Sequence, residues 1–193
     1  MKKNEKIQLQ LESISNIPGD LNNCKVTMRA VGTDDVMSIV IGAYEGRAIY
    51  MGAKGIQQNR PMTHDLFAGV MNAMAVKLWR VVIYKVEKGI YYTYLYFQKD
   101  YGVMRVDART SDALAMAVRM GAPIFTYKEL LMNALIGQDC SIKVEDDLEE
   151  FKEIKVITPG VDALKQQLDE AIQKEDYEKA AELRDQLKEM GYQ

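Results

Sequence analysis

A β-hairpin constrains the fold of this chain more than any other feature. Residues 79–98, WRVVIYKVEKGIYYTYLYFQ, contain two runs of β-branched and aromatic residues on either side of Glu87-Lys88-Gly89. Two such runs around a glycine-containing turn predict a pair of antiparallel strands. Residues 101–108 continue the pattern, so we expect a third strand beside the hairpin. The centre of the fold is therefore expected to be a sheet with antiparallel strands.

Further strands are predicted on both sides of this hairpin. Residues 7–14 and 24–31 alternate between apolar and polar side chains, which is typical of a half-buried strand. Residues 36–43 are more continuously apolar, and this favours a strand buried on both faces. Residues 123–127 predict one more short strand.

Helical periodicity appears in four segments of the same region, at residues 44–55, 63–78, 111–122 and 128–135. We expect Thr63 to be the N-cap of the second helix, and Ser111 is a candidate cap for the third. Asp65 falls in the first turn of the second helix, where the helix dipole favours an anion. Strands and helices in clusters, joined by hairpins, favour an α+β fold with a mixed or antiparallel sheet and clustered helices.

The charge balance changes along the chain. Residues 1–134 hold 17 Lys and Arg against 12 Asp and Glu, a net charge of +5, whereas residues 135–158 and 159–193 each carry −4. A basic first part is compatible with a polyanionic partner, and an acidic end is compatible with a protein partner.

Three regions are predicted from this change in composition. Residues 1–135 are expected to form a domain, residues 136–158 an acidic linker, and residues 159–193 a hairpin of two helices. The first helix is expected over residues 159–173, with Thr158-Pro159 supplying the cap and the first helical residue, and the second over residues 177–190.

Cellular location follows from what the sequence lacks. No run reaches the roughly 18 apolar residues of a membrane span. The N-terminal segment MKKNEKIQLQ has no apolar core or cleavage site of a secretory signal. Cys24 and Cys140 are far apart and fit neither a disulfide framework nor a zinc motif. We expect a cytoplasmic protein without membrane contact.

The C-terminal hairpin is too small to bury its apolar stripes by itself. The stripes consist of Val161, Leu164, Leu168 and Ala171 on one helix and Ala180, Leu183, Leu187 and Met190 on the other. Pairing with a second hairpin in a four-helix bundle is favoured over folding back on the first domain. The segment DYEKAAELRDQLKEM resembles the UVR motif of the excision-repair proteins UvrB and UvrC. This resemblance implies a module that binds another UVR-type hairpin.

Residues suited to catalysis occur in three stretches, each at a strand end or a helix start, where distant segments can converge on one cleft. The candidate catalytic residues are Glu45, His64, Asp65, Asp107 and Asp112, and the candidate substrate-binding residues are Arg60, Arg109 and Arg119. Arginines can hold a phosphate through two hydrogen bonds, and histidine can act as a base. Together these residue types suit cleavage of a phosphodiester bond.

A divalent cation, Mg²⁺ or Mn²⁺, is a candidate cofactor, with Asp65, Asp107 and Asp112 as ligands. The same residues also permit other interpretations. Asp107 with Arg109, or Asp112 with Arg60, can form structural ion pairs. The cleft can also hold a small anionic ligand, although the chain has no glycine-rich phosphate loop of the usual spacing.

The order of four segments is more specific than any one of them. VIGAYEGRAI, RPMTHDL, RVVIYKVEKGIYYTYLYF and DARTSDALAMAVRMGAPIF resemble the bifunctional nuclease domain family over residues 10–134. The matching positions are Glu45, Arg60, Pro61, Thr63, His64, Asp65, Arg80, Asp107, Arg109, Ser111, Asp112 and Arg119. Thr110 stands where the family commonly has proline, and a threonine can serve there as a cap.

This resemblance implies an α+β domain, often dimeric, with nuclease activity on DNA and RNA. A nuclease of low sequence specificity is therefore the leading hypothesis. The alternative is a non-enzymatic interaction or regulatory protein that acts through its UVR hairpin.

Overall fold

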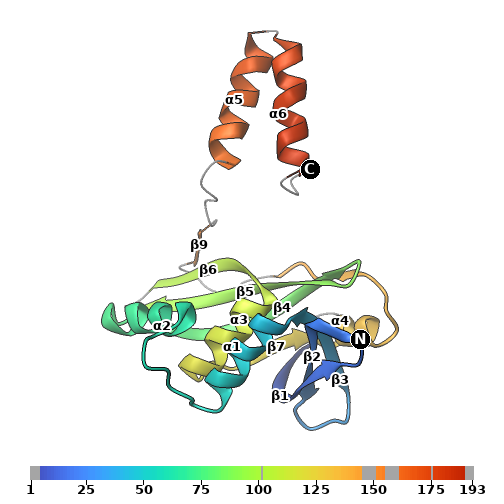
Figure 1. The fold of residues 1–193 in the computed structure, drawn as a ribbon, viewed down its shortest axis with the longest axis vertical. Coiled ribbons are helices and arrows are strands. Elements are labelled where there is room, and N and C mark those ends of the chain that lie inside the picture. The colour runs from blue at the N-terminus through green and yellow to red at the C-terminus, as the bar shows by residue number, and fades with distance from the viewer. Residues whose placement is uncertain (1–4, 101, 145–150, 155–160, 175, 190–193) are drawn as a thin grey trace. The chain divides into compact units, whose positions relative to one another are not determined.

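The computed structural model describes residues 5–100, 102–144, 151–154, 161–174 and 176–189. The chain divides into two units, residues 1–154 and 155–193. The first is an α+β domain with a mixed sheet, and the second is a pair of helices (Figure 1). The predicted fold class is confirmed.

Nine strands form one sheet in the described part of the chain, in the order β3-β2-β1-β7-β4-β5-β6-β9, with β8 beside β4. Their bounds are β1 (Lys6–Ile17), β2 (Asp20–Ala30), β3 (Val36–Gly42), β4 (Lys77–Glu87), β5 (Ile90–Lys99), β6 (Gly102–Arg109), β7 (Ile124–Tyr127), β8 (Cys140–Ser141) and β9 (Phe151–Ile154). The pairs β4–β7 and β6–β9 are parallel, and the other pairs are antiparallel.

The predicted hairpin is the pair β4 and β5, and β6 is the predicted third strand. Glu87 lies opposite Ile90, so only Lys88 and Gly89 form the turn. Both have a positive φ, 50° and 78°. This is the conformation that a two-residue turn needs to match the twist of its strands.

Strand β7 joins the two halves of the sheet. It lies between β1 and β4 and so connects the β1–β2–β3 set with the β4–β5–β6 set. The chain reaches β7 from β6 through helix α3 (Thr110–Met120), which is buried along most of its length. The largest set of buried side chains spans both halves of the sheet and this helix; it includes Val26, Met28, Val81, Ile83, Leu114 and Met116.

Strand β3 differs from its prediction as a strand buried on both faces. It lies at one end of the strand order, where Met37 and Ile39 are buried while Ser38 and Val40 are exposed. Only one of its faces is covered, so burial alternates along the strand. The continuous apolar run concealed this alternation.

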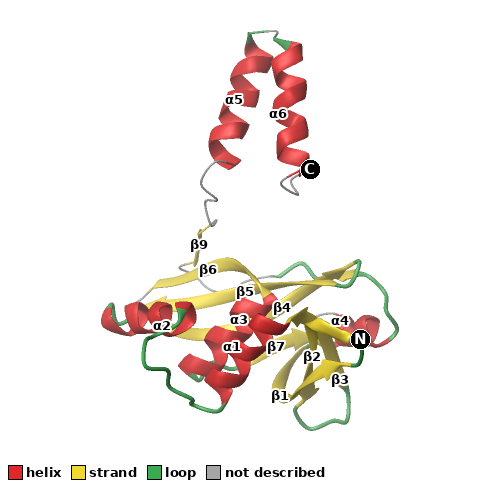
Figure 2. Cartoon of the chain, viewed as in Figure 1, coloured by secondary structure: helices red, strands yellow, loops and turns green. Residues whose placement is uncertain are grey.

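Three helices gather beside the sheet, namely α1 (Ala43–Ala53), α2 (Thr63–Ala73) and α3, and α4 (Lys128–Leu135) lies apart from them (Figure 2). The predicted helix over residues 63–78 is too long. Helix α2 ends at Ala73 because Ala75 has a positive φ of 56°, and β4 already begins at Lys77.

The predicted helix caps are also corrected. Thr63 is the first helical residue of α2 rather than its N-cap, which is Met62. Ser111 lies inside α3, and Thr110 is the first residue of that helix. The Thr110 hydroxyl donates to the carbonyl of Tyr91 at 2.9 Å and lies 2.7 Å from the hydroxyl of Thr93. Thr110 thus attaches the start of α3 to β5.

Two short strands lie within the segment predicted to be a linker. Strand β8 pairs with Lys85 and Val86 of β4, and β9 runs parallel to β6. The first unit accordingly extends to Ile154. A strand added to a sheet gains backbone hydrogen bonds whatever its side chains are, so an acid-rich composition does not exclude it.

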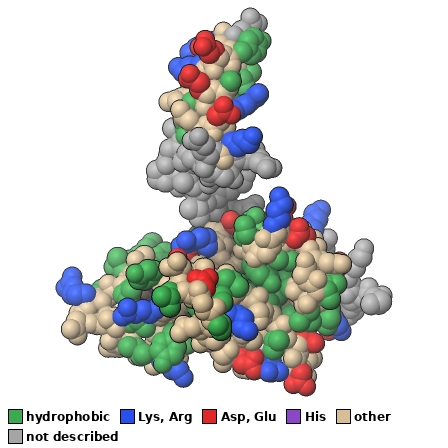
Figure 3. Space-filling view, turned by 45° about the vertical axis from the view of Figure 1, so that its right-hand side comes forward, with side chains coloured by type: hydrophobic (Ala, Val, Ile, Leu, Met, Phe, Trp, Pro, Cys, Tyr) green, Lys and Arg blue, Asp and Glu red, His purple; other side chains and the backbone are tan. Residues whose placement is uncertain are grey.

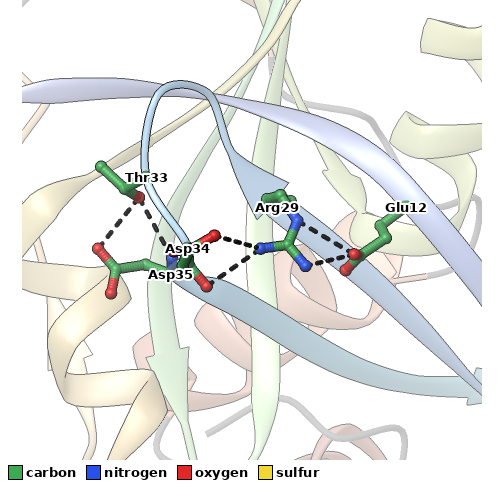
Figure 4. Close-up of polar contacts among 5 residues, drawn as sticks. All are labelled: Glu12, Arg29, Thr33, Asp34 and Asp35. Carbon is green, nitrogen blue, oxygen red and sulfur yellow. Dashed lines mark hydrogen bonds and ion pairs between the residues drawn. The ribbon is translucent and has the colours of Figure 1, made fainter.

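The turn between β2 and β3 is fixed by an exposed ion-pair cluster (Figure 4). The Arg29 guanidinium contacts the Glu12 carboxylate on β1 and the Asp34 carboxylate in the turn. The Thr33 hydroxyl also accepts a hydrogen bond from the backbone N–H of Asp35 at 3.2 Å. These contacts explain the turn, and they lie outside the residues predicted for catalysis.

The second unit consists of α5 (Val161–Gln173) and α6 (Tyr177–Glu189). The buried residues Ala171, Ala180 and Leu183 form its centre, with Leu164 and Leu168 packed against them. The Asp176 carboxylate accepts the backbone N–H of Lys179 at 3.2 Å and caps α6. Thr158, Pro159 and Met190 lie outside the described residues. Neither these helices nor any other helix in the described ranges is long and apolar enough to cross a membrane.

Candidate active site

Four of the predicted residues form one connected network. His64 Nε2 lies 3.1 Å from Asp112 Oδ1. Arg109 binds the same carboxylate through Nε at 2.7 Å and through its NH2 group at 3.2 Å. The NH1 group of Arg109 lies 3.9 Å from Glu45 Oε1. These contacts bring together residues that begin three different helices.

The position of this network follows from how α1, α2 and α3 begin. Glu45 lies in the first turn of α1, His64 in the first turn of α2, and Asp112 in the first turn of α3. Arg109 is the N-cap residue of α3. The N-terminal end of a helix carries a partial positive charge that favours anions. Glu45 and Asp112 are carboxylates placed at two of these helix ends.

The Arg109 side chain is more exposed to solvent than the Asp112 side chain. Burial by itself raises the pKa of the Asp112 carboxyl, but the hydrogen bonds from Arg109 and His64 outweigh it and lower the pKa below its ordinary value. The Arg109 side chain is 71% exposed. Its Nε–NH2 edge is held by Asp112 and its NH1 group lies near Glu45, while most of the side chain stays accessible to a ligand.

Arg119 has a different position from that predicted for a substrate-binding residue. Its side chain is only 7% exposed, and its Nε donates to Asp65 Oδ1 at 2.6 Å. The NH1 group donates to the carbonyls of Ala48 and Ala115, both at 2.9 Å. Arg119 therefore connects α3 with α1 and α2, and this position supports a structural role.

Helix α1 comes close to α3 because residue 52 has no side chain. A Cβ atom at Gly52 would lie 2.7 Å from both the NH1 group of Arg119 and a methyl carbon of Val118. Glycine at this position therefore leaves room for the Arg119 guanidinium to reach α1.

Asp65 is held from two directions. One carboxylate oxygen binds Arg119, and the other accepts the backbone N–H of Met62 at 3.0 Å. The hydrogen bond from Arg119 is the largest of the effects that lower the pKa of the Asp65 carboxyl. Asp65 thus secures the first turn of α2, and it contacts Arg119 rather than the network around Asp112.

Asp107 and Arg109 line an open cleft of about 320 Å³ between β3, β5, β6 and the start of α3. The Asp107 carboxylate accepts a hydrogen bond from the Tyr84 hydroxyl at 3.3 Å. Arg60 lies in the loop before α2, where it is exposed and forms no hydrogen bond or ion pair with the described residues. Asp112 pairs with Arg109 rather than with Arg60.

The three carboxylates predicted as metal ligands do not come together. Asp65 contacts Arg119, Asp112 contacts Arg109 and His64, and Asp107 contacts Tyr84. No cluster of three or more His, Cys, Asp or Glu suited to a metal ion occurs in the ranges that the structure describes. A cation bound by all three carboxylates does not fit this arrangement.

Two family models match parts of this chain. Residues 26–139, which include every predicted site residue, match the bifunctional nuclease domain. This chain belongs to the bifunctional nuclease domain family. Residues 161–193 match the UvrB/uvrC motif. Both predicted resemblances are confirmed.

Relatives of this family member occur in Mycobacterium tuberculosis. Uncharacterized protein MT1877 and uncharacterized protein Rv1829, from two strains, are each 32% identical to this chain over 139 residues. The match covers 68% of this chain and 83% of each relative.

Two tyrosines beside the site were not predicted. Tyr84 binds Asp107, and Tyr92 lines the cleft beside Arg109. Tyr92, Tyr94 and Tyr96 alternate along β5, which places them on one face of the sheet. That spacing could have indicated an aromatic face, but not its distance from the start of α3.

Proposed function

We propose that this protein is a nuclease of low sequence specificity that hydrolyses phosphodiester bonds in DNA, RNA or both. The observation that carries the proposal is the bonding of His64 and Arg109 to the same carboxylate, Asp112. Membership of the bifunctional nuclease domain family supports it. We also propose that the protein acts in the cytoplasm.

In this proposal His64 is the general base. With Asp112 ionised, His64 Nε2 carries a proton and donates it in the hydrogen bond, so the other ring nitrogen holds a lone pair. That nitrogen takes a proton from the attacking water as its oxygen bonds to phosphorus. The leaving oxygen takes a proton from solvent. Asp112 fixes the tautomer and stabilises the imidazolium, as a carboxylate does beside other catalytic histidines.

Arg109 is the proposed phosphate-binding residue. Its exposed guanidinium can donate hydrogen bonds to phosphoryl oxygens, and these strengthen as charge develops in the transition state. Glu45 positions the same guanidinium from α1. Asp107 and Arg60 are proposed to contact the substrate further from the reacting phosphate.

The decisive experiment measures cleavage of single- and double-stranded DNA and RNA by the purified full-length chain. We expect His64→Gln and Arg109→Gln each to reduce the rate at least about tenfold, a loss of about 1.4 kcal/mol of transition-state stabilisation. A metal requirement stays a prediction, so the assay is run with Mg²⁺, with Mn²⁺ and with a chelator. Cleavage that survives both substitutions unchanged would show that another site or a contaminant is responsible.

A homodimer is part of the proposal, and α2 supports it. Leu66 and Val70 are exposed and lie four residues apart, so they share one face of the helix, and the exposed Met74 follows at its C-cap. In a twofold-symmetric contact the same patch meets itself, and an uncharged apolar patch avoids repulsion between like charges. Sedimentation should show a dimer that Val70→Glu converts to a monomer, and a monomeric wild type would reject this contact.

The UVR hairpin is proposed to bind another hairpin of the same type. Its own buried centre is small, and Ile172 and Tyr177 stay exposed. The alternative function is non-enzymatic and depends on this binding alone. It is favoured if the protein cuts none of the four substrates but binds a second UVR-containing protein, with Tyr177→Glu weakening that binding.

A further inference from the structure

The cleft beside Arg109 combines surfaces of two chemical kinds. One wall is apolar and comes from Val40 of β3 and Ile90 of β5, which are both 61% exposed. Tyr92 lines the same cleft, and the Lys85 ammonium lies 4.6 Å from the centroid of the Tyr92 ring. The charged residues that line the cleft are the exposed Asp107 and Arg109.

The two sides of this cleft are held at a fixed separation. The Tyr91 hydroxyl on β5 donates to the carbonyl of Ser38 on β3 at 3.4 Å. The buried Thr93–Thr110 contact attaches β5 to the start of α3. The cleft is thus bordered by segments that are bonded to each other, while its apolar side chains remain open to solvent. Exposed apolar side chains around a concave site indicate a ligand with an apolar face.

A nucleotide has the matching combination of groups. Its base is flat and apolar on both faces and stacks on aromatic side chains. Its edge carries amino and imino donors that a carboxylate can accept. Its phosphate is an anion for which an arginine is the usual partner. We propose that this cleft binds one base of a single-stranded nucleic acid while the adjoining phosphate lies on Arg109.

Single strands are favoured over duplexes for a geometric reason. A base in a duplex is stacked and paired, so neither its faces nor its edge can enter a cleft without unpairing. On the face drawn in Figure 3, Lys and Arg side chains lie at separate positions. This inference rests on the proposed nuclease function and names the class of its substrate.

The first test compares different ligands on one and the same protein variant. Fluorescence anisotropy compares a labelled oligothymidylate with an abasic oligomer of the same number of phosphates, using the full-length His64→Gln chain so that binding is measured without turnover. We expect the abasic oligomer and a duplex of equal length each to bind at least about tenfold more weakly, the effect of losing one stacked base. Equal affinity for the oligothymidylate and the abasic oligomer, or for the single strand and the duplex, overturns the proposal.

The second test locates the base. In the same background, Val40→Gln and Ile90→Gln replace exposed apolar side chains of the cleft without adding charge. The matched control is Val31→Gln, because Val31 is half exposed and follows β2 outside the cleft. We expect the two cleft variants to lose about threefold to tenfold in affinity for oligothymidylate and to bind the abasic oligomer like the control.

Two negative results have different meanings. If the cleft variants bind oligothymidylate as the control does, the base is bound elsewhere and the assignment of the cleft fails. If the wild type cuts no nucleic acid but the base-dependent affinity is present and lost in the cleft variants, the nuclease proposal fails and the binding site stands. Unchanged fluorescence of Trp79, the single tryptophan, verifies that each variant is folded.

Discussion

Replacement of Arg119 by methionine should destabilise the first unit by about 2–3 kcal/mol. Methionine keeps an unbranched apolar stem but removes the guanidinium that connects α3 with Asp65 and with the carbonyls of Ala48 and Ala115. A hydrogen bond to a charged group contributes about 1.5–3 kcal/mol, and each bond to a carbonyl about 1 kcal/mol. The desolvation cost of the buried guanidinium disappears in the variant and offsets part of this loss.

Urea unfolding of the Arg119→Met chain, followed by Trp79 fluorescence, measures this effect on the first unit alone. Trp79 lies on β4, and the UVR hairpin contains no tryptophan. The expected loss corresponds to a melting temperature lower by about 5–10 °C. The matched control is Arg60→Met, which changes an exposed arginine and should stay within about 0.5 kcal/mol of wild type. An Arg119→Met chain as stable as this control would refute the structural role of Arg119.

Three further outcomes are expected. Asp112→Asn should slow cleavage at least about tenfold because it weakens the orientation of His64, and cleavage at the wild-type rate would reject the proposed pair. Asp65→Asn should make stability depend less on pH below about 4. The folded pKa of Asp65 is lowered, so its contribution is present above the unfolded pKa and disappears as pH falls through the folded one; urea midpoints from pH 3 to 7 check this. Gly52→Ala should destabilise the first unit by about 1–3 kcal/mol by displacing Arg119, measured by Trp79 fluorescence.

The candidate residues could be found from the sequence. Which of them join the network around Asp112 and which pair with Arg119 could not. Residue type and position near helix starts singled out His64, Asp112 and Arg109, and the structure connects them directly. Nothing in the sequence separates His64 from its neighbour Asp65. Adjacent residues in a helix point in directions about 100° apart, and here one contacts Asp112 and the other Arg119. The orientation of α2 against α3 decides that His64 contacts Asp112 and that Asp65 contacts Arg119.

The predicted boundaries of helices and strands were wrong where the local sequence signals were weak. The positive φ of Ala75 ends α2 five residues before the predicted end, although alanine is a strong helix former. Strand β8 is two residues long and owes its place to β4. Helix α2 ends in local backbone hydrogen bonds from Ala75 to Asn72 and from Val76 to Met71, whereas β8 depends on its pairing with β4.

The sequence by itself determined most of the strands and helices, though not β8 and β9, because apolar periodicity and turn residues act over a few positions. It also determined the two family motifs, since these depend only on residue order. The tertiary structure decided that β7 lies between β1 and β4, that Arg119 is buried between three helices, and that Arg109 remains open beside a cleft. Contacts of this kind join residues far apart in the chain, and they depend on how completed elements pack against one another.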